Sequence, residues 1–121
     1  MKQKPAYNKY IETISREEFF SLYECCKPES LFSERELLAF PFPKNARSLA
    51  GRYLIKKSIC NYLDTPGRMS EIEILNNDSG KPEVILGTEL INNTEVAGIK
   101  KILCSISHSK NLIAGMTIIC F

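Results

Sequence analysis

The sequence predicts an α+β fold, with an antiparallel sheet packed on one long helix that follows short N-terminal helices. Three observations indicate this fold. The longest stretch with helical periodicity and no internal proline runs from Leu49 to Leu63. Two segments that open with helix-capping patterns precede this stretch, and the second half consists mostly of alternating or β-branched segments separated by turn formers. We expect a single domain over residues 1–121, because this length can bury a core of its own.

The N-terminal part is predicted to contain one strand and two helices. The strand covers Tyr7–Ile14, which is rich in aromatic and β-branched residues. Ser15 with Glu18, and Ser33 with Glu36, have the spacing of capping boxes, so each pair marks the beginning of a helix. Prolines follow both segments and end the predicted helices.

The long helix carries two cations near the middle of its apolar stripe. Arg52 and Lys56 lie one turn apart, and like charges at this spacing repel each other. Burying either one without a partner would cost far more than this repulsion. We therefore expect an anion over this face, unless both side chains extend to solvent or pair with a carboxylate of the protein. Lys44 and Arg47 lie in the loop and the first turn that lead into the helix.

The second half is predicted to form antiparallel hairpins. Residues 76–80 and residues 108–111 are dense in turn formers, and each group separates two strand-like segments. The predicted elements are the strands Glu71–Leu75, Pro82–Leu86, Ile102–Ser107 and Leu112–Cys120, and a weak helix over Glu89–Val96.

Composition argues against several classes of protein. The net charge of +2 gives no indication of a nucleic-acid partner or of a membrane surface, and no apolar run has the length of a membrane span. The five cysteines include no C-x-x-C pair, so neither a disulfide framework nor a zinc site is predicted. The segment Met1–Pro5 is charged and no apolar stretch follows it. We therefore expect no signal peptide, and a cytoplasmic protein.

Four polar residues are candidates for chemistry, namely Arg52, Lys56, Lys81 and His108. His108 is the only histidine and comes at a predicted strand end, immediately before a turn. Lys81 follows a Ser-Gly pair at the other predicted turn. The sequence contains no P-loop and no metalloprotease motif. From the residues alone, we predict an anion-binding α+β domain.

Five motifs, taken in order, resemble the holo-acyl-carrier-protein synthase family, whose members are small trimeric 4′-phosphopantetheinyl transferases. The motifs are Phe32-Ser33 with Glu36, Leu49-Ala50-Gly51-Arg52-Tyr53 with Lys56, Glu71-Ile72-Glu73-Ile74-Leu75, Asp78-Ser79-Gly80-Lys81-Pro82 and Ser105-Ile106-Ser107-His108-Ser109. The resemblance extends over roughly residues 8 to 120. This chain looks like a divergent member.

The resemblance implies that 4′-phosphopantetheine moves from coenzyme A to a serine of an apo acyl-carrier protein, as in fatty-acid biosynthesis, with release of adenosine 3′,5′-bisphosphate. It also implies a homotrimer with sites between subunits, and Arg16 and Arg35 as cations that attract the carrier protein. The catalytic residues implied are Lys56, Lys57 and His108. The residues implied to bind coenzyme A are Arg52, Lys56, Gly80, Lys81, Pro82, Ser107, His108, Lys44 and Arg47.

The metal site of the family is where this chain departs from the pattern. The family holds Mg2+ with an aspartate of the first strand and a glutamate directly after the helix lysine, and Tyr10 and Lys57 stand at these positions here. One alternative is that Lys57 supplies part of the missing positive charge. A second is that Glu12, Glu17, Glu18 or a neighbouring subunit supplies carboxylates. A third is a non-catalytic relative that binds coenzyme A or a carrier protein.

Overall fold

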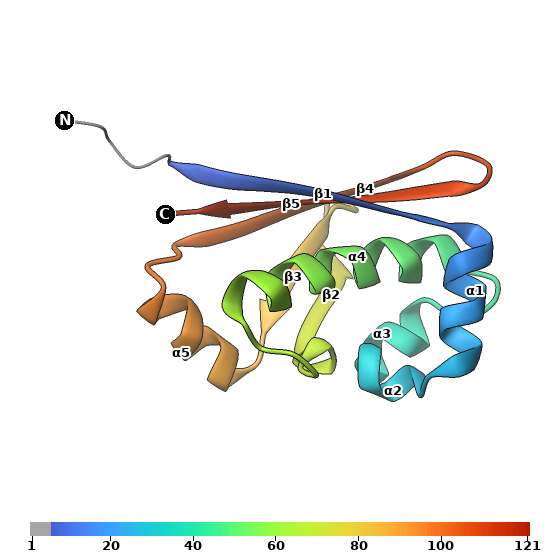
Figure 1. The fold of residues 1–121 in the computed structure, drawn as a ribbon, viewed down its shortest axis with the longest axis horizontal. Helices are drawn as coiled ribbons and strands as arrows, with labels where there is room; N and C mark the ends of the chain where they lie inside the picture. The colour runs from blue at the N-terminus through green and yellow to red at the C-terminus, as the bar shows by residue number, and fades with distance from the viewer. Residues whose placement is uncertain (1–5) are drawn as a thin grey trace.

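The computed structural model describes residues 6–121, so the expectation about Met1–Pro5 lies outside the described residues. The predicted α+β fold is confirmed (Figure 1). The elements are β1 (Tyr7–Ser15), α1 (Arg16–Cys25), α2 (Pro28–Leu31), α3 (Glu34–Ala39), α4 (Ala46–Leu63), the 3-10 turn η1 (Met69–Glu71), β2 (Ile72–Asn76), β3 (Pro82–Leu86), α5 (Thr88–Val96), β4 (Lys101–His108) and β5 (Leu112–Cys120).

The strands form two antiparallel sheets rather than one. β5 lies between β1 and β4 in a three-stranded sheet, and β2 pairs with β3 in a separate hairpin. The long helix α4 packs against the three-stranded sheet, with α1–α3 near one end and α5 near the other, and β3 lies beside β4 (Figure 1). Among residues 6–121, no further strand pairs with the outer edge of β2 at Ile74. There the Ile74 N–H donates to the Glu36 side chain, and the Ile74 carbonyl oxygen accepts from the Arg52 side chain.

The helix beginnings follow the capping patterns. Ser15 Oγ accepts a hydrogen bond from the Glu18 N–H at 3.1 Å, and α1 begins at Arg16, directly after Ser15. At α3 both bonds of the capping box form, because Ser33 Oγ accepts from the Glu36 N–H and Glu36 Oε1 accepts from the Ser33 N–H. The short helix α2 was not predicted, and it begins with Pro28, which suits a first helical position.

α4 packs closely under the three-stranded sheet because two glycines meet there. A Cβ atom on Gly51 would lie 2.3 Å from Ile106 Cγ2, and one on Gly115 would lie 3.0 Å from the Gly51 carbonyl oxygen. Buried apolar side chains fill the space on either side of this contact, in one cluster toward α1–α3 and another toward α5. The close contact places the N-terminal half of α4 beside the end of β4, where His108 lies.

The five cysteines are all free thiols. Among the described residues, no helix is both long enough and apolar enough to cross a lipid bilayer.

Candidate functional site

Two neighbouring cavities open beside the N-terminal half of α4. The first has a volume of about 240 Å3, and its lining includes Arg47, Ser48, Arg52, Asn76, Pro82 and His108. The second has a volume of about 420 Å3, and its lining includes Arg16, Lys44, Arg47, Ser48 and His108. Arg47, Ser48 and His108 border both cavities, so the two form a continuous basic region. The fold brings these residues together from the beginning of α1, from the loop before α4 and α4 itself, from the ends of the β2–β3 hairpin and from the end of β4.

Arg52 lines the first cavity and is held in place by three hydrogen bonds. Only 3% of this residue is exposed. Its Nε donates to the Ile74 carbonyl oxygen at 2.7 Å, Nη1 donates to the Ser48 carbonyl oxygen at 3.1 Å, and Nη2 donates to Asn76 Oδ1 at 3.0 Å. The guanidinium carbon lies 3.8 Å from the centre of the Phe40 ring. The guanidinium is therefore positioned before any ligand arrives.

The charge of Arg52 has no carboxylate partner. Its three hydrogen-bond acceptors are neutral, and it forms no ion pair within residues 6–121. These bonds use three of the five N–H groups of a guanidinium, which leaves two for a ligand. Burial lowers the pKa of Arg52 while Glu36 opposes this change, and the group stays protonated because an arginine pKa is so high. A nearly buried, uncompensated cation beside a cavity favours an anionic ligand there.

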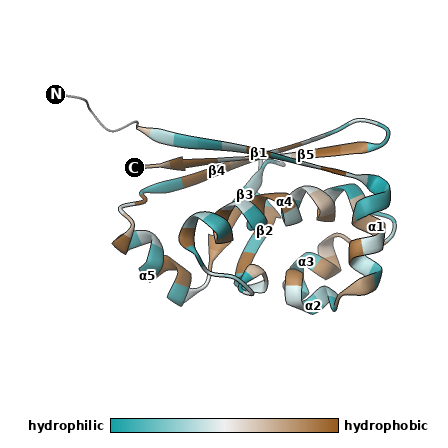
Figure 2. Cartoon of the chain, viewed as in Figure 1, coloured by the Kyte–Doolittle hydropathy of each residue, from teal (hydrophilic) through white to brown (hydrophobic). Residues whose placement is uncertain are grey.

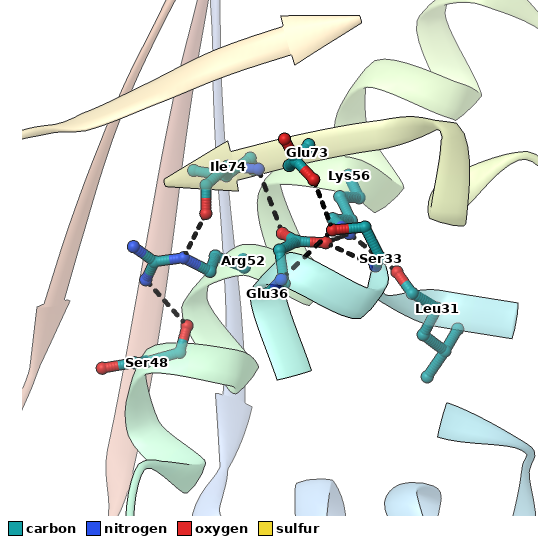
Figure 3. Close-up of polar contacts among 8 residues, drawn as sticks. All are labelled: Leu31, Ser33, Glu36, Ser48, Arg52, Lys56, Glu73 and Ile74. Carbon is teal, nitrogen blue, oxygen red and sulfur yellow. Dashed lines mark hydrogen bonds and ion pairs between the residues drawn. The ribbon is translucent and has the colours of Figure 1, made fainter. Parts of the chain in front are cut away.

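Lys56 occupies a different environment, although it lies only one turn further along α4. Its Nζ donates to Glu36 Oε1 and, at 2.8 Å, to the Leu31 carbonyl oxygen (Figure 3). The side chains of Lys56 and Glu36 are both completely buried. Burial lowers the pKa of Lys56, and the neighbouring Glu36 carboxylate opposes this change. The sequence predicted an anion near Lys56, and in the structure that anion is the Glu36 carboxylate. Lys56 lines neither cavity.

The remaining residues predicted to bind coenzyme A divide into two groups. Pro82, Lys44 and Arg47 line the cavities. Gly80 and Lys81 are exposed in the β2–β3 turn, and Ser107 is exposed on β4; none of these three lines either cavity. The turn itself is ordered by Asn77, whose Oδ1 accepts from the N–H groups of Ser79 and Lys81.

Lys57 faces β1, on a different side of α4 from Arg52. Its Nζ lies 3.8 Å from Glu12 Oε2 in a half-exposed ion pair. Tyr10, at the other family metal position, packs against Tyr62 with ring centres 6.2 Å apart. Within the part of the chain that the structure describes, no three His, Cys, Asp or Glu residues are grouped closely enough to hold a metal ion. These residues do not fit Mg2+, which prefers carboxylate oxygens and would be repelled by the Lys57 ammonium.

Arg16 and Arg35, predicted to attract a carrier protein, lie among acidic residues and other contacts of the first helices. Arg35 is exposed but pairs with Glu73 at 3.1 Å. Arg16 lies over the Phe20 ring and lines the second cavity. The acidic residues of α1 include Glu17 and Glu18 in its first turn.

Sequence reasoning missed Glu36, Asn76 and Ser48 as parts of the site. Glu36 was assigned to a helix cap and to the first family motif, and neither assignment refers to a distant residue. Asn76 was assigned to a turn. The one signal available for Glu36 was the unpaired lysine in an apolar stripe, which required a buried carboxylate somewhere in the chain.

Comparisons with known proteins agree with this architecture. No family model matches the chain. It is 37% identical to the holo-[acyl-carrier-protein] synthase of Natranaerobius thermophilus over 84 residues, covering 66% of this chain and 67% of that protein. The match to the synthase of Thermodesulfovibrio yellowstonii is 30% over 120 residues, covering 90% and 94%. The chain also matches fatty acid synthase subunit alpha of Schizosaccharomyces pombe at 35% over 77 residues, covering 60% of this chain but only 4% of that protein.

Solved structures have the same fold. The holo-[acyl-carrier-protein] synthase of Neisseria meningitidis superposes with a TM-score of 0.78 at 21% identity, covering 92% of this chain and 95% of that one. The Helicobacter pylori synthase, in complex with coenzyme A, superposes with a TM-score of 0.70 at 19% identity, covering 93% and 99%. Because the Thermodesulfovibrio relative reaches 30% identity over nearly its whole length, this chain belongs to the holo-[acyl-carrier-protein] synthase family.

Proposed function

We propose that the protein transfers 4′-phosphopantetheine from coenzyme A to a serine of an apo acyl-carrier protein and releases adenosine 3′,5′-bisphosphate. One observation carries the binding part of this proposal: Arg52, almost completely buried and without a carboxylate partner, lines the same cavity as His108. The relatives named as synthases and the neighbouring structure with coenzyme A support the choice of ligand and reaction. Membership in the family also makes a cytoplasmic location our expectation.

The basic region has the chemistry to hold the phosphates of coenzyme A. Arg52 offers two free N–H groups, and His108 can donate to a phosphate oxygen. Arg47 and Lys44 border the beginning of α4, where the first helical amides lack a side-chain cap and favour an anion. Charge builds on the phosphate oxygens as the serine hydroxyl attacks, and cations already in place stabilise that charge without reorganisation.

Lys57 is the residue that separates an active enzyme from a binding protein. In the active alternative, its ammonium supplies part of the positive charge that the family obtains from a metal. In the other alternative, the chain binds coenzyme A or a carrier protein without turnover. The residue at position 57 places a cation where the family has a carboxylate, and this cation pairs with Glu12.

The transfer reaction can be measured directly by the intact mass of an apo acyl-carrier protein after incubation with coenzyme A and this protein. We expect a phosphopantetheine adduct that persists when a chelator replaces Mg2+ or Mn2+. An adduct that requires added metal would contradict the role of Lys57. If no adduct forms under any condition while coenzyme A still raises the melting temperature, the protein is the non-catalytic binder.

We also propose that the protein is a homotrimer that associates through the outer face of the three-stranded sheet. The helices cover the other face (Figure 1), and β5 is hydrophobic over much of its length (Figure 2). Ile11 and Leu103 are large apolar side chains on this sheet with 61% and 42% of their surface exposed. Exposed apolar surface of this kind is typical of an interaction site.

Sedimentation equilibrium tests this assembly. We expect three chains per particle for the unaltered protein and a shift toward smaller particles for Leu103→Glu, because a carboxylate there would be buried in the interface. Ile85→Glu is a matched control, since Ile85 is 45% exposed on the other sheet. A monomer in the unaltered protein would contradict the trimer.

A further inference from the structure

We propose that Lys56 and Glu36 are positioning residues: Lys56 neutralises the Glu36 carboxylate, so that Arg52 keeps its positive charge available for a phosphate in the first cavity. The inference rests on the proposed function and deepens it, because it identifies what controls the affinity of the same site for coenzyme A. Neither Lys56 nor Glu36 touches the ligand in this proposal.

The geometry brings Glu36 and Arg52 to the same residue of β2. Glu36 Oε2 accepts from the Ile74 N–H at 3.0 Å, and Arg52 Nε donates to the Ile74 carbonyl oxygen at 2.7 Å (Figure 3). The carboxylate and the guanidinium are therefore close along one strand edge, but they form no ion pair with each other. The ion pair of Glu36 is with Lys56, through the other carboxylate oxygen.

A buried carboxylate this close would otherwise offset the charge of Arg52. Electrostatic interactions are strong in a site removed from water, so an unneutralised Glu36 would weaken the attraction between Arg52 and a phosphate. The charged residues buried here are Arg52, Lys56 and Glu36, two cations and one anion. The cluster thus carries one net positive charge, and Arg52 is its only member that lines the cavity.

Stability alone does not account for the Lys56–Glu36 pair. Desolvation of two buried charges often outweighs their attraction, and apolar replacements of similar volume are frequently neutral or stabilising. Glu36 also accepts from the N–H groups of Ser33 and Ile74, which an amide side chain would satisfy only in part. Variants that remove one charge or both therefore separate the electrostatic role from the structural one.

The test uses Lys56→Met, Glu36→Gln and the double variant, with the dissociation constant for coenzyme A measured by calorimetry and the free energy of unfolding measured in urea. All variants are assayed in the same buffer at pH 8. We expect both single variants to be less stable. We expect Lys56→Met to bind coenzyme A about tenfold more weakly, Glu36→Gln to bind at least as tightly as the unaltered protein, and the double variant to regain affinity to within about threefold.

A purely structural pair would give a different result, because affinity would then fall with stability in both single variants; that outcome would overturn the inference. Lys101→Met is the control, since it removes an exposed cation at the opposite end of β4 from His108. If Lys56→Met does not fold, the double variant decides, and a loss of coenzyme A binding in it overturns the inference. If the unaltered protein itself does not bind coenzyme A, the proposed function fails instead.

Discussion

Replacing Arg52 by lysine is expected to weaken the binding of coenzyme A by roughly tenfold to a hundredfold, although the charge is conserved. The planar guanidinium bonds Ile74, Ser48 and Asn76 at the same time and keeps two N–H groups free. An ammonium cannot match this geometry, and each lost bond to a charged group is worth about 1.5–3 kcal/mol. Calorimetry with coenzyme A and with adenosine 3′,5′-bisphosphate measures the effect.

Arg68→Lys is the matched control for this prediction. Arg68 lies at the beginning of η1, where it pairs with Glu71 and Glu89 away from the basic region. Its replacement should leave coenzyme A affinity unchanged. Unchanged affinity in Arg52→Lys would mean that the phosphates bind elsewhere, and the proposed site would be wrong.

Replacing Lys57 by glutamate is expected to create a response to Mg2+ that the unaltered protein lacks. The new carboxylate would lie beside Glu12, which is already within ion-pair distance of residue 57, and paired carboxylates are suitable Mg2+ ligands. Without metal, the two like charges should destabilise the variant. With Mg2+, we expect its melting temperature to rise and the rate of carrier-protein modification to increase at least about tenfold over the metal-free rate.

Lys57→Gln separates the two roles of the lysine, because it removes the ammonium without adding a ligand. If the ammonium stabilises the reacting phosphates, this variant should be slower than the unaltered protein under all conditions. Should Lys57→Glu respond to Mg2+ in neither assay, Lys57 would be an ordinary surface residue and its alignment with the family's metal ligand would be incorrect.

Local patterns were sufficient for most of the secondary structure. Ser15 and Ser33 mark helix beginnings because the hydrogen bonds of a cap join residues only three positions apart. β5 has the predicted bounds, because turn formers precede a continuous β-branched and apolar segment. α4 begins three residues earlier than predicted, at Ala46, which is buried three positions before Leu49 and so continues the apolar spacing of the helix.

The spacing of residues in the sequence was less informative about the site than about the secondary structure. It identified Arg52 and His108 as candidates, and the cavity that they share is consistent with that prediction. It grouped Lys56 with them because residues one turn apart lie on one helix face. The resemblance added Lys57 as a catalytic residue, which stays a prediction; in the structure its side chain pairs with Glu12 of β1.

The residues along the chain were thus enough to indicate the family, the α+β class and the presence of two cations in an apolar stripe. Packing between distant segments determined which of the two cations lines a cavity. α3 brings the Glu36 carboxylate onto Lys56, while the end of β2 presents only neutral acceptors to Arg52. A buried charge must be compensated, and its partner comes from the elements packed against it. Those tertiary contacts cannot be read from the spacing of residues along one segment.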